Sequence, residues 1–130
     1  MVSGSYSCKK GMVMMHKILV VEDNADHAYL MEYILTKEGF EVEVVNTGQK
    51  AIDKCTQGHY SPVVIDLGLP DMTGDRVVGK IREMDAYRDT PFLAYTASAA
   101  FDEDMEKTFV DIISKPVLPQ VIRDQIRNWT

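Results

Sequence analysis

Four short apolar runs, each followed by charged or hydroxyl side chains, constrain the fold of this chain most strongly. Apolar runs of this length, bounded by polar or turn residues, are typical of strands buried on both faces of a parallel sheet. The runs and the residues that follow them are 17–21 before Glu22 and Asp23, 63–65 before Asp66, 92–95 before Thr96, and 112–114 before Lys115 and Pro116. The chain is therefore predicted to fold around a parallel sheet.

Helical patterns lie between the predicted strands. Residues 25–38 are predicted to form the first helix, with Asn24 as its N-cap and Gly39 just past its last turn. Within this helix, side chains suited to a core recur at the i, i+3, i+4 and i+7 spacing of a helix that lies on a sheet. The residues expected to face the sheet are His27, Leu30, Met31 and Ile34.

The alternation of strand and helix continues along the chain. Further strands are expected at residues 41–45, 63–66, 91–96 and 111–114, and further helices between Thr47 and Gly58, at 75–84, around Phe101, Met105 and Phe109, and from Pro119 onward. Repeated strand-helix units imply a parallel sheet with right-handed crossovers. The predicted fold class is α/β, a doubly wound parallel sheet of five strands with helices on both faces.

Polar residues after these strands predict a binding site, because ligands of open α/β sheets bind at the carboxyl ends of the strands. Carboxylates held close together repel one another, and a hard divalent cation with oxygen ligands relieves that repulsion. Mg²⁺ suits a site that receives a phosphoryl group, because it binds few carboxylates and accepts water and phosphate oxygens. The residues gathered at this edge are Glu22, Asp23, Asp66, Thr96 and Lys115.

Asp66 is the natural nucleophile of such a site, because it is the only carboxylate that ends the third predicted strand. Attack of an aspartate on phosphorus gives an aspartyl phosphate, a known type of covalent intermediate. Phosphoryl transfer otherwise needs mainly positioning and neutralisation of charge. The compact ammonium of Lys115 and the hydroxyl of Thr96 are suited to that task.

The composition is that of an ordinary globular domain and argues against several classes of function. The net charge of −6 disfavours direct nucleic-acid binding, which usually needs a basic patch. No apolar stretch approaches the roughly 20 residues of a membrane span. Cys8 and Cys55 suggest no disulfide framework, which favours a reducing compartment, the cytoplasm. No apolar run precedes Cys8, so we expect residues 1–15 to be a disordered tail and not a secretory signal, before a domain at 16–130.

These motifs, in this order, resemble the receiver domains of two-component response regulators, the CheY-like superfamily. The resemblance covers about residues 16–129, and no single motif in it would be specific. It is carried by the acidic pair Glu22-Asp23, by Asp66 with Pro70 and Gly74 after it, by Thr96-Ala97, and by Lys115-Pro116. The resemblance implies a flavodoxin-like sheet with the strand order 2-1-3-4-5 and a cis peptide bond between Lys115 and Pro116.

The resemblance also implies a role in phosphorelay signalling. Asp66 would accept a phosphoryl group from a histidine kinase or phosphotransfer protein, and the phosphoprotein would change its binding to an unknown output protein. Thr96 and Lys115 would bind the phosphoryl oxygens. A stand-alone receiver of this kind is a signalling phosphoacceptor and not an enzyme, because it catalyses only its own phosphorylation and dephosphorylation.

A ligand set for Mg²⁺ follows from the same resemblance. Asp23, Asp66 and the backbone carbonyl of Gly68 would bind the cation, and Glu22 would act through a water molecule. Gly68 stands where the family commonly has a larger side chain. This departure leaves the chemistry intact, because only a backbone carbonyl is needed there.

Two other departures concern how the signal leaves the site. Ile112 occupies the position, three before Lys115, where the family usually has an aromatic switch residue. The segment from Thr96 to Lys115 is about one turn shorter than usual and lacks the common Gly-Ala step. Ile is stiff at χ1 and has no ring to turn inward. We therefore expect the rearrangement on phosphorylation to centre on the loops after Asp66 and Thr96.

Two other functions are weighed against this prediction. A Mg²⁺-dependent phosphohydrolase on a similar sheet generally has a second acid two residues after its nucleophile, and here that position is Gly68. An interaction module of receiver-like fold that never uses its phosphate would not need the complete set of acids, hydroxyl and lysine. Both alternatives are therefore disfavoured.

Overall fold

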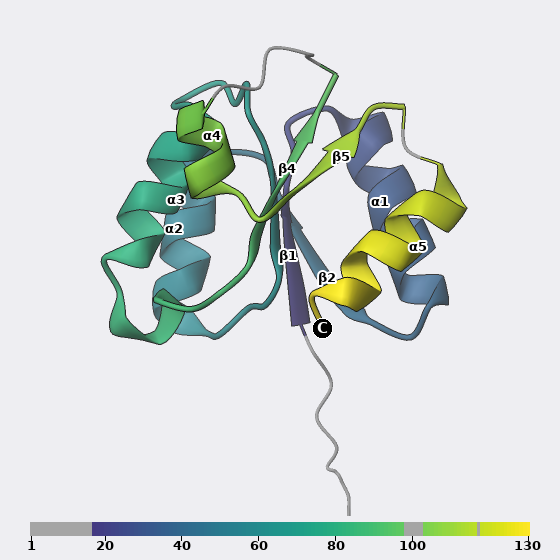
Figure 1. Cartoon of the computed structure of the whole chain (residues 1–130), viewed down its shortest axis with the longest axis horizontal. Coiled ribbons are helices and arrows are strands. Elements are labelled where there is room, and N and C mark those ends of the chain that lie inside the picture. The colour runs from purple at the N-terminus through teal and green to yellow at the C-terminus, as the bar shows by residue number, and fades with distance from the viewer. Residues whose placement is uncertain (1–16, 98–102, 117) are drawn as a thin grey trace, which may run out of the picture.

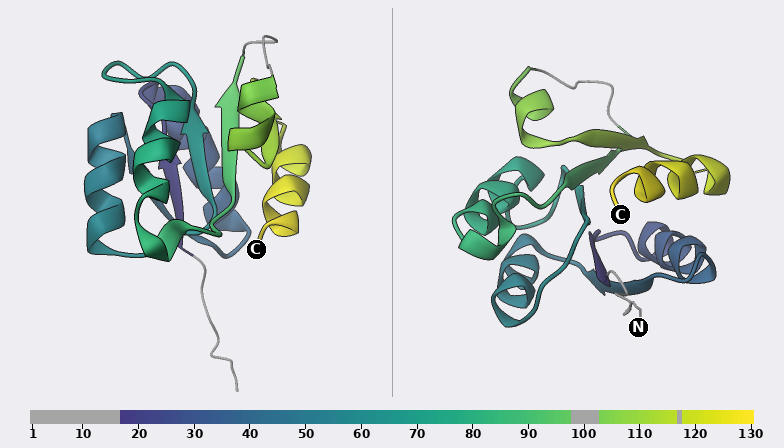
Figure 2. Two further views of the ribbon diagram at one scale, coloured as in Figure 1. Left: turned by 60° about the vertical axis from the view of Figure 1, so that its left-hand side comes forward. Right: turned by 60° about the horizontal axis from the view of Figure 1, so that its bottom comes forward.

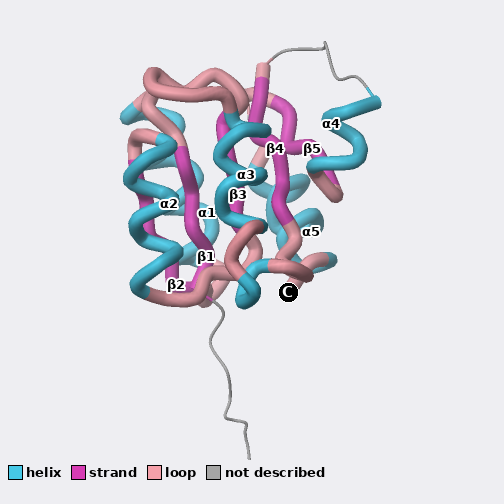
Figure 3. The backbone as a smooth tube through the Cα atoms, turned by 90° about the vertical axis from the view of Figure 1, so that its left-hand side faces the viewer, coloured by secondary structure: helices cyan, strands magenta, loops and turns pink. Residues whose placement is uncertain are grey.

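The computed structural model describes residues 17–97, 103–116 and 118–130, and these form a parallel sheet covered by helices (Figure 1). All its strand pairs are parallel, and the strand order is β2-β1-β3-β4-β5, which confirms the predicted fold class and order. Figure 3 shows the same strands from the side of α2 and α3. The strands are β1 Lys17–Val21, β2 Glu41–Val45, β3 Val63–Asp66, β4 Phe92–Thr96 and β5 Asp111–Ser114.

Helices cover both faces of the sheet, as the sequence predicts. Helices α1 and α5 lie together on one face, and α2, α3 and α4 lie on the other (Figures 1 and 2). The helices are α1 Ala25–Lys37, α2 Gly48–Gln57, α3 Gly74–Arg82, α4 Glu103–Thr108 and α5 Pro119–Asn128, with a short 3₁₀ helix, η1, at Asp85–Tyr87.

The core is divided by the sheet into two halves, and β1 contributes to both. Leu19 and Val21 pack toward α2 and α3, whereas Ile18 and Val20 pack toward α1 and α5. None of these four side chains is exposed to solvent. Burying each one stabilises the fold by about 1.5–3 kcal/mol, so the apolar runs that predicted the strands also anchor the site at their ends.

The predicted face of α1 is wrong in part. Met31 and Ile34 are buried as expected, but Leu30 is 38% exposed and His27 is only half-buried. The buried stripe instead includes Ala28 and Leu35, so the helix is rotated toward these two residues relative to the predicted face. Leu35 lies at i+7 from Ala28, on the same face of the helix. Burying the apolar Leu35 side chain stabilises the fold more than burying the half-polar His27 side chain would.

The predicted N-cap of α1 is confirmed, and α2 has a side-chain cap as well. The Asn24 side chain accepts a hydrogen bond from the His27 N–H, and the Thr47 hydroxyl accepts one from the Lys50 N–H. Gly39 has a φ of 94°, the left-handed conformation that favours glycine after a helix. Helix α3 begins one residue before the predicted start and ends two residues before the predicted end, within ordinary boundary variation.

Some predictions fall outside the described residues. The expected tail at 1–15 and Phe101 lie in the parts of the chain that are not described. Phe109, from the same predicted helix as Phe101, is buried, with 3% of its surface exposed. Among the described residues, no helix has the length and apolar character needed to cross a bilayer.

Candidate functional site

The register of the sheet brings the predicted site residues to one edge. Val21 pairs with Ile65, so Glu22 and Asp66 follow at the same level on neighbouring strands. On the other side of β3, Asp66 pairs with Tyr95, which directly precedes Thr96. Thr96 in turn pairs with Ser114, the residue before Lys115. At four strands, the last residue or the residue directly after it therefore lies at a common site.

The three carboxylates lie close enough to share a cation. One oxygen from each of Glu22, Asp23 and Asp66 lies within 4.8 Å of the others. Glu22 is 1% exposed, Asp66 is half-buried and Asp23 is exposed, so the cluster opens to solvent on the Asp23 side. Three hard oxygen donors of this kind fit Mg²⁺, which prefers carboxylate and water oxygens.

Lys115 lies against two of these carboxylates. Its Nζ is 2.6 Å from Glu22 Oε1 and 3.1 Å from Asp66 Oδ2. The contact with Glu22 is an ion pair without the alignment of a hydrogen bond, whereas the contact with Asp66 is hydrogen-bonded. The Lys115–Pro116 peptide bond is cis, as the resemblance implied. Lys115 thus supplies an ammonium that neutralises part of the charge of Glu22 and Asp66.

The pKa values of the two buried acids move in opposite directions. Burial raises the pKa of Glu22, and the neighbouring Asp66 carboxylate adds to that rise. Burial acts in the same sense on Asp66, but hydrogen bonds with Glu22, the Gly68 N–H and Lys115 outweigh it and lower the pKa of Asp66. Burial alone would lower the pKa of Lys115, yet its contacts with Glu22 and Asp66 raise it. At neutral pH, Asp66 is therefore ionised and Lys115 is charged.

Thr96 and Gly68 occupy the positions that the sequence analysis assigned to them. Thr96 is 7% exposed at the end of β4, and its backbone carbonyl accepts a hydrogen bond from the Lys115 N–H at 3.0 Å. The Gly68 N–H donates to Asp66 Oδ1 at 3.0 Å, which places Gly68 beside the Asp66 carboxylate. Their assigned contacts with phosphoryl oxygens and Mg²⁺ stay predictions.

Close packing against the end of β3 explains why the residue eight positions after Asp66, Gly74, is a glycine. A Cβ at this position would lie 2.8 Å from the Asp66 carbonyl oxygen and 3.1 Å from Ile65 Cγ2 and Leu67 Cα. Two of these three neighbours are backbone atoms that cannot move without displacing the end of β3. The residue must therefore lack a side chain for α3 to begin so close to Asp66.

Two residues near the acids were not predicted to belong to the site. His27 Nδ1 lies 3.5 Å from Glu22 Oε1, although the sequence analysis placed His27 in the core. Tyr95 is buried beneath the site, with Lys115 Nζ 4.6 Å from its ring centroid and the His27 ring edge-on at 6.4 Å. The only sequence signal for Tyr95 was its place directly before Thr96.

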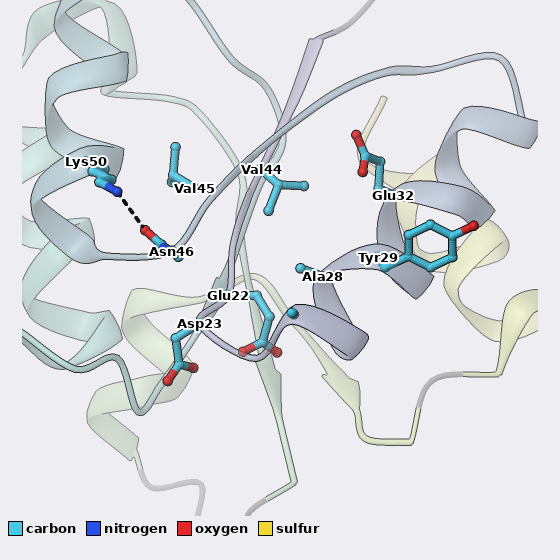
Figure 4. A pocket seen from close by; sticks show the side chains of 10 residues that line it. Glu22, Asp23, Ala28, Tyr29, Glu32, Val44, Val45, Asn46 and Lys50 are labelled. Carbon is cyan, nitrogen blue, oxygen red and sulfur yellow. Dashed lines mark hydrogen bonds between the residues drawn. The ribbon is translucent and has the colours of Figure 1, made fainter.

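A cleft of about 450 Å³ adjoins the acids on the α1 side (Figure 4). Glu22 and Asp23 line one end of it, and Tyr29 and Glu32 of α1 line another part. Lys50, also in its wall, donates a hydrogen bond to Asn46 Oδ1 at 3.1 Å. Two of the three acids, Glu22 and Asp23, therefore border a concave surface.

Comparison with known proteins gives a family match over nearly the whole chain. A family model described as the response regulator receiver domain matches residues 18–127. Hybrid signal transduction histidine kinase L of Dictyostelium discoideum is 34% identical over 125 aligned positions, which cover 89% of this chain and 7% of that protein. Transcriptional regulatory protein SrrA of Staphylococcus aureus (strain NCTC 8325) is 31% identical over 112 positions, which cover 84% of this chain and 45% of that protein. The chain thus spans less than half the length of either relative.

A solved structure shares the fold of this chain. The receiver domain of a sensor histidine kinase from Pseudomonas aeruginosa PAO1 superposes with a TM-score of 0.81 at 25% sequence identity. The superposition covers 89% of this chain and 98% of that one. That crystal structure has a magnesium ion coordinated in its active-site cleft.

Proposed function

The chain belongs to the family of response regulator receiver domains, and on that premise we propose that Asp66 is its phosphoacceptor. In this proposal a carboxylate oxygen of Asp66 attacks the phosphorus of a phosphohistidine on a histidine kinase or phosphotransfer protein. An O–P bond forms as the P–N bond of the donor breaks, and the leaving imidazole takes up a proton. Thr96 and Lys115 bind the oxygens of the transferred group.

The observation that carries this proposal is the environment of the Asp66 carboxylate. Its Oδ2 lies 3.1 Å from the Lys115 ammonium, and its pKa is lowered despite burial by hydrogen bonds with Glu22, the Gly68 N–H and Lys115. An ionised carboxylate beside a fixed cation is a competent nucleophile toward phosphorus. The proposal follows because, within the described ranges, Asp66 is the carboxylate that combines this environment with the end of a central strand.

The neighbouring acids support a role for Mg²⁺. Asp23, Asp66 and the Gly68 carbonyl would hold the cation, and Glu22 would act through a water molecule. When bound, Mg²⁺ supplies positive charge that offsets the charge of the phosphoryl oxygens. The carboxylate cluster fits this donor set, and the magnesium ion in the similar Pseudomonas receiver supports the proposal by analogy.

The chain is proposed to act in the cytoplasm through partner proteins. A histidine kinase or phosphotransfer protein would supply the phosphoryl group, and the phosphorylated form would change its affinity for an output protein. We expect no direct contact with nucleic acid, because the net charge of −6 opposes binding to phosphate backbones.

Two small phosphate donors separate this proposal from a phosphohydrolase. Phosphoramidate carries the P–N bond of phosphohistidine, and p-nitrophenyl phosphate is a generic ester. With Mg²⁺, phosphoramidate should label the protein once and the Asp66→Asn variant not at all, while p-nitrophenyl phosphate is not turned over. Continuous turnover of the ester would instead identify a phosphohydrolase, and equal labelling of Asp66→Asn would exclude Asp66 as the acceptor.

A further inference from the structure

The loop after the phosphoacceptor strand is anchored at its tip to the start of α2. Asp71 lies in this loop, between β3 and α3, and accepts two backbone hydrogen bonds from α2. Its Oδ1 receives the Gly48 N–H at 2.8 Å, and its Oδ2 receives the Gln49 N–H at 2.9 Å. Both oxygens of one carboxylate are thus used to join two segments 22 to 23 positions apart in the chain.

Close packing beside these hydrogen bonds strengthens the same junction. Gly48 has no side chain, and a Cβ there would lie 2.6 Å from Met72 Cγ and 2.7 Å from Val77 Cγ2. Met72, which follows Asp71, therefore packs directly on the backbone of the first helical residue. The tip of the loop is held by a charge-assisted pair of hydrogen bonds and by van der Waals contact.

The base of the same loop holds residues of the proposed metal and phosphoryl site. Gly68 and Thr73 pair as an antiparallel bridge, so the segment between them forms a closed turn with Asp71 near its tip. The Gly68 N–H also donates to Asp66 Oδ1 at 3.0 Å. A displacement of the tip would therefore be transmitted across the bridge to Gly68 and to the Asp66 carboxylate.

We propose that Asp71 is a positioning residue for the metal and phosphoryl site, holding the Gly68 carbonyl and the Asp66 carboxylate in place by pinning their loop to α2. This inference rests on the proposed function and deepens it. By linkage, if the anchored loop favours the cation, then the bound cation must favour the anchored loop to the same extent. Helix α2 should therefore become more protected at its first turn when Mg²⁺ binds.

A plain helix cap is the competing interpretation, and the same helix turn offers a matched comparison. Thr47 also caps α2, because its hydroxyl accepts the Lys50 N–H at 3.1 Å. Thr47 lies in the connection from β2, however, and not in the loop that follows Asp66. Removing either cap should lower the melting temperature, whereas only the removal of Asp71 should weaken the binding of Mg²⁺ at the site.

Calorimetric titration with Mg²⁺ distinguishes these interpretations. Asp71→Ala should weaken Mg²⁺ binding by about tenfold, the lower end of the range for residues that orient metal ligands. Thr47→Ala should leave the dissociation constant unchanged within error. Asp71→Asn keeps one acceptor oxygen and should lie between the wild type and Asp71→Ala. Equal Mg²⁺ affinities for Asp71→Ala and Thr47→Ala would overturn the inference while leaving the proposed function intact.

Amide hydrogen exchange of the wild-type protein gives a second readout that needs no variant. Exchange at Gly48 and Gln49 should slow on addition of Mg²⁺, whereas exchange in η1, at the opposite end of the strands, should not. Unchanged exchange at both amides in protein that binds Mg²⁺ would overturn the inference. Failure of the wild type to bind Mg²⁺ at all would overturn the proposed function and the inference with it.

Discussion

Replacement of Lys115 by Met removes the ammonium from the buried acids and should destabilise the metal-free protein. The side chain keeps most of its apolar stem, but Glu22 and Asp66 lose a cation at 2.6 and 3.1 Å. Breaking a fully buried ion pair costs about 3–5 kcal/mol, and we expect about 3 kcal/mol because Asp66 retains some contact with water. For a domain of this size, that loss corresponds to a fall in melting temperature of about 10 °C.

The stability that Lys115→Met loses should depend on pH, and the direction of this dependence follows from the pKa of Glu22. Burial raises the pKa of this carboxyl above its ordinary value of 4.5, so the folded state holds the proton more readily than the unfolded chain. Such a group favours folding most at pH values below 4.5, and that contribution is lost as pH rises through the raised folded pKa. The stability difference between Lys115→Met and the wild type should therefore be small at acidic pH and largest at pH values above neutrality.

Thermal unfolding in the presence of EDTA, followed by circular dichroism across this pH range, measures the effect. Lys17→Met is the matched control, because Lys17 pairs with Glu43 at 3.1 Å but is 40% exposed. Exposed ion pairs contribute only about 0–1 kcal/mol to the free energy of unfolding. If Lys115→Met lost no more stability than Lys17→Met, or lost the same amount at every pH, the account of Lys115 as the neutralising group would be wrong.

Three further predictions concern the cation, the loop and the output. Asp23→Asn should relieve repulsion and raise the melting temperature of the metal-free protein while abolishing the rise on adding Mg²⁺; a full Mg²⁺ response would place the cation elsewhere. Gly74→Ala should cost about 1–3 kcal/mol in unfolding experiments, because its Cβ would meet the Asp66 backbone at 2.8 Å. Gly79→Ala in the same helix has no neighbour within 4 Å and should cost nothing. With a beryllofluoride mimic, amide shifts should be largest after Asp66 and Thr96, and equally large shifts through Ile112 and α5 would contradict this.

The strands and the site residues were predictable because each depends on a local pattern. A buried parallel strand requires a continuous apolar run, and the residue after such a run must lie at the binding edge. Asp66 and Lys115 are 49 positions apart, yet their contact follows from the ends of two strands in the predicted order. The cis bond before Pro116 came from family resemblance and not from any local pattern.

The contacts between segments were not predictable in this way. The rotation of α1 depends on whether Leu35 or Leu30 packs better against the sheet, and both fit a helical spacing. The hydrogen bonds from Gly48 and Gln49 to Asp71 depend on how α2 and α3 lie side by side, and Asp71 alone suggests only a turn. The positions of His27 and Tyr95 around the ammonium likewise depend on side-chain packing, which a spacing pattern does not encode.

The central claim is that Asp66 accepts a phosphoryl group in a reaction that requires Mg²⁺, and intact mass spectrometry after incubation with acetyl phosphate tests it most directly. The wild type and the exposed-site control Asp53→Asn should each gain the mass of one phosphoryl group, stable to acid and labile to base. Asp66→Asn, and wild type in EDTA, should gain none. Full labelling of Asp66→Asn, or labelling of the wild type that is indifferent to EDTA, would contradict the account.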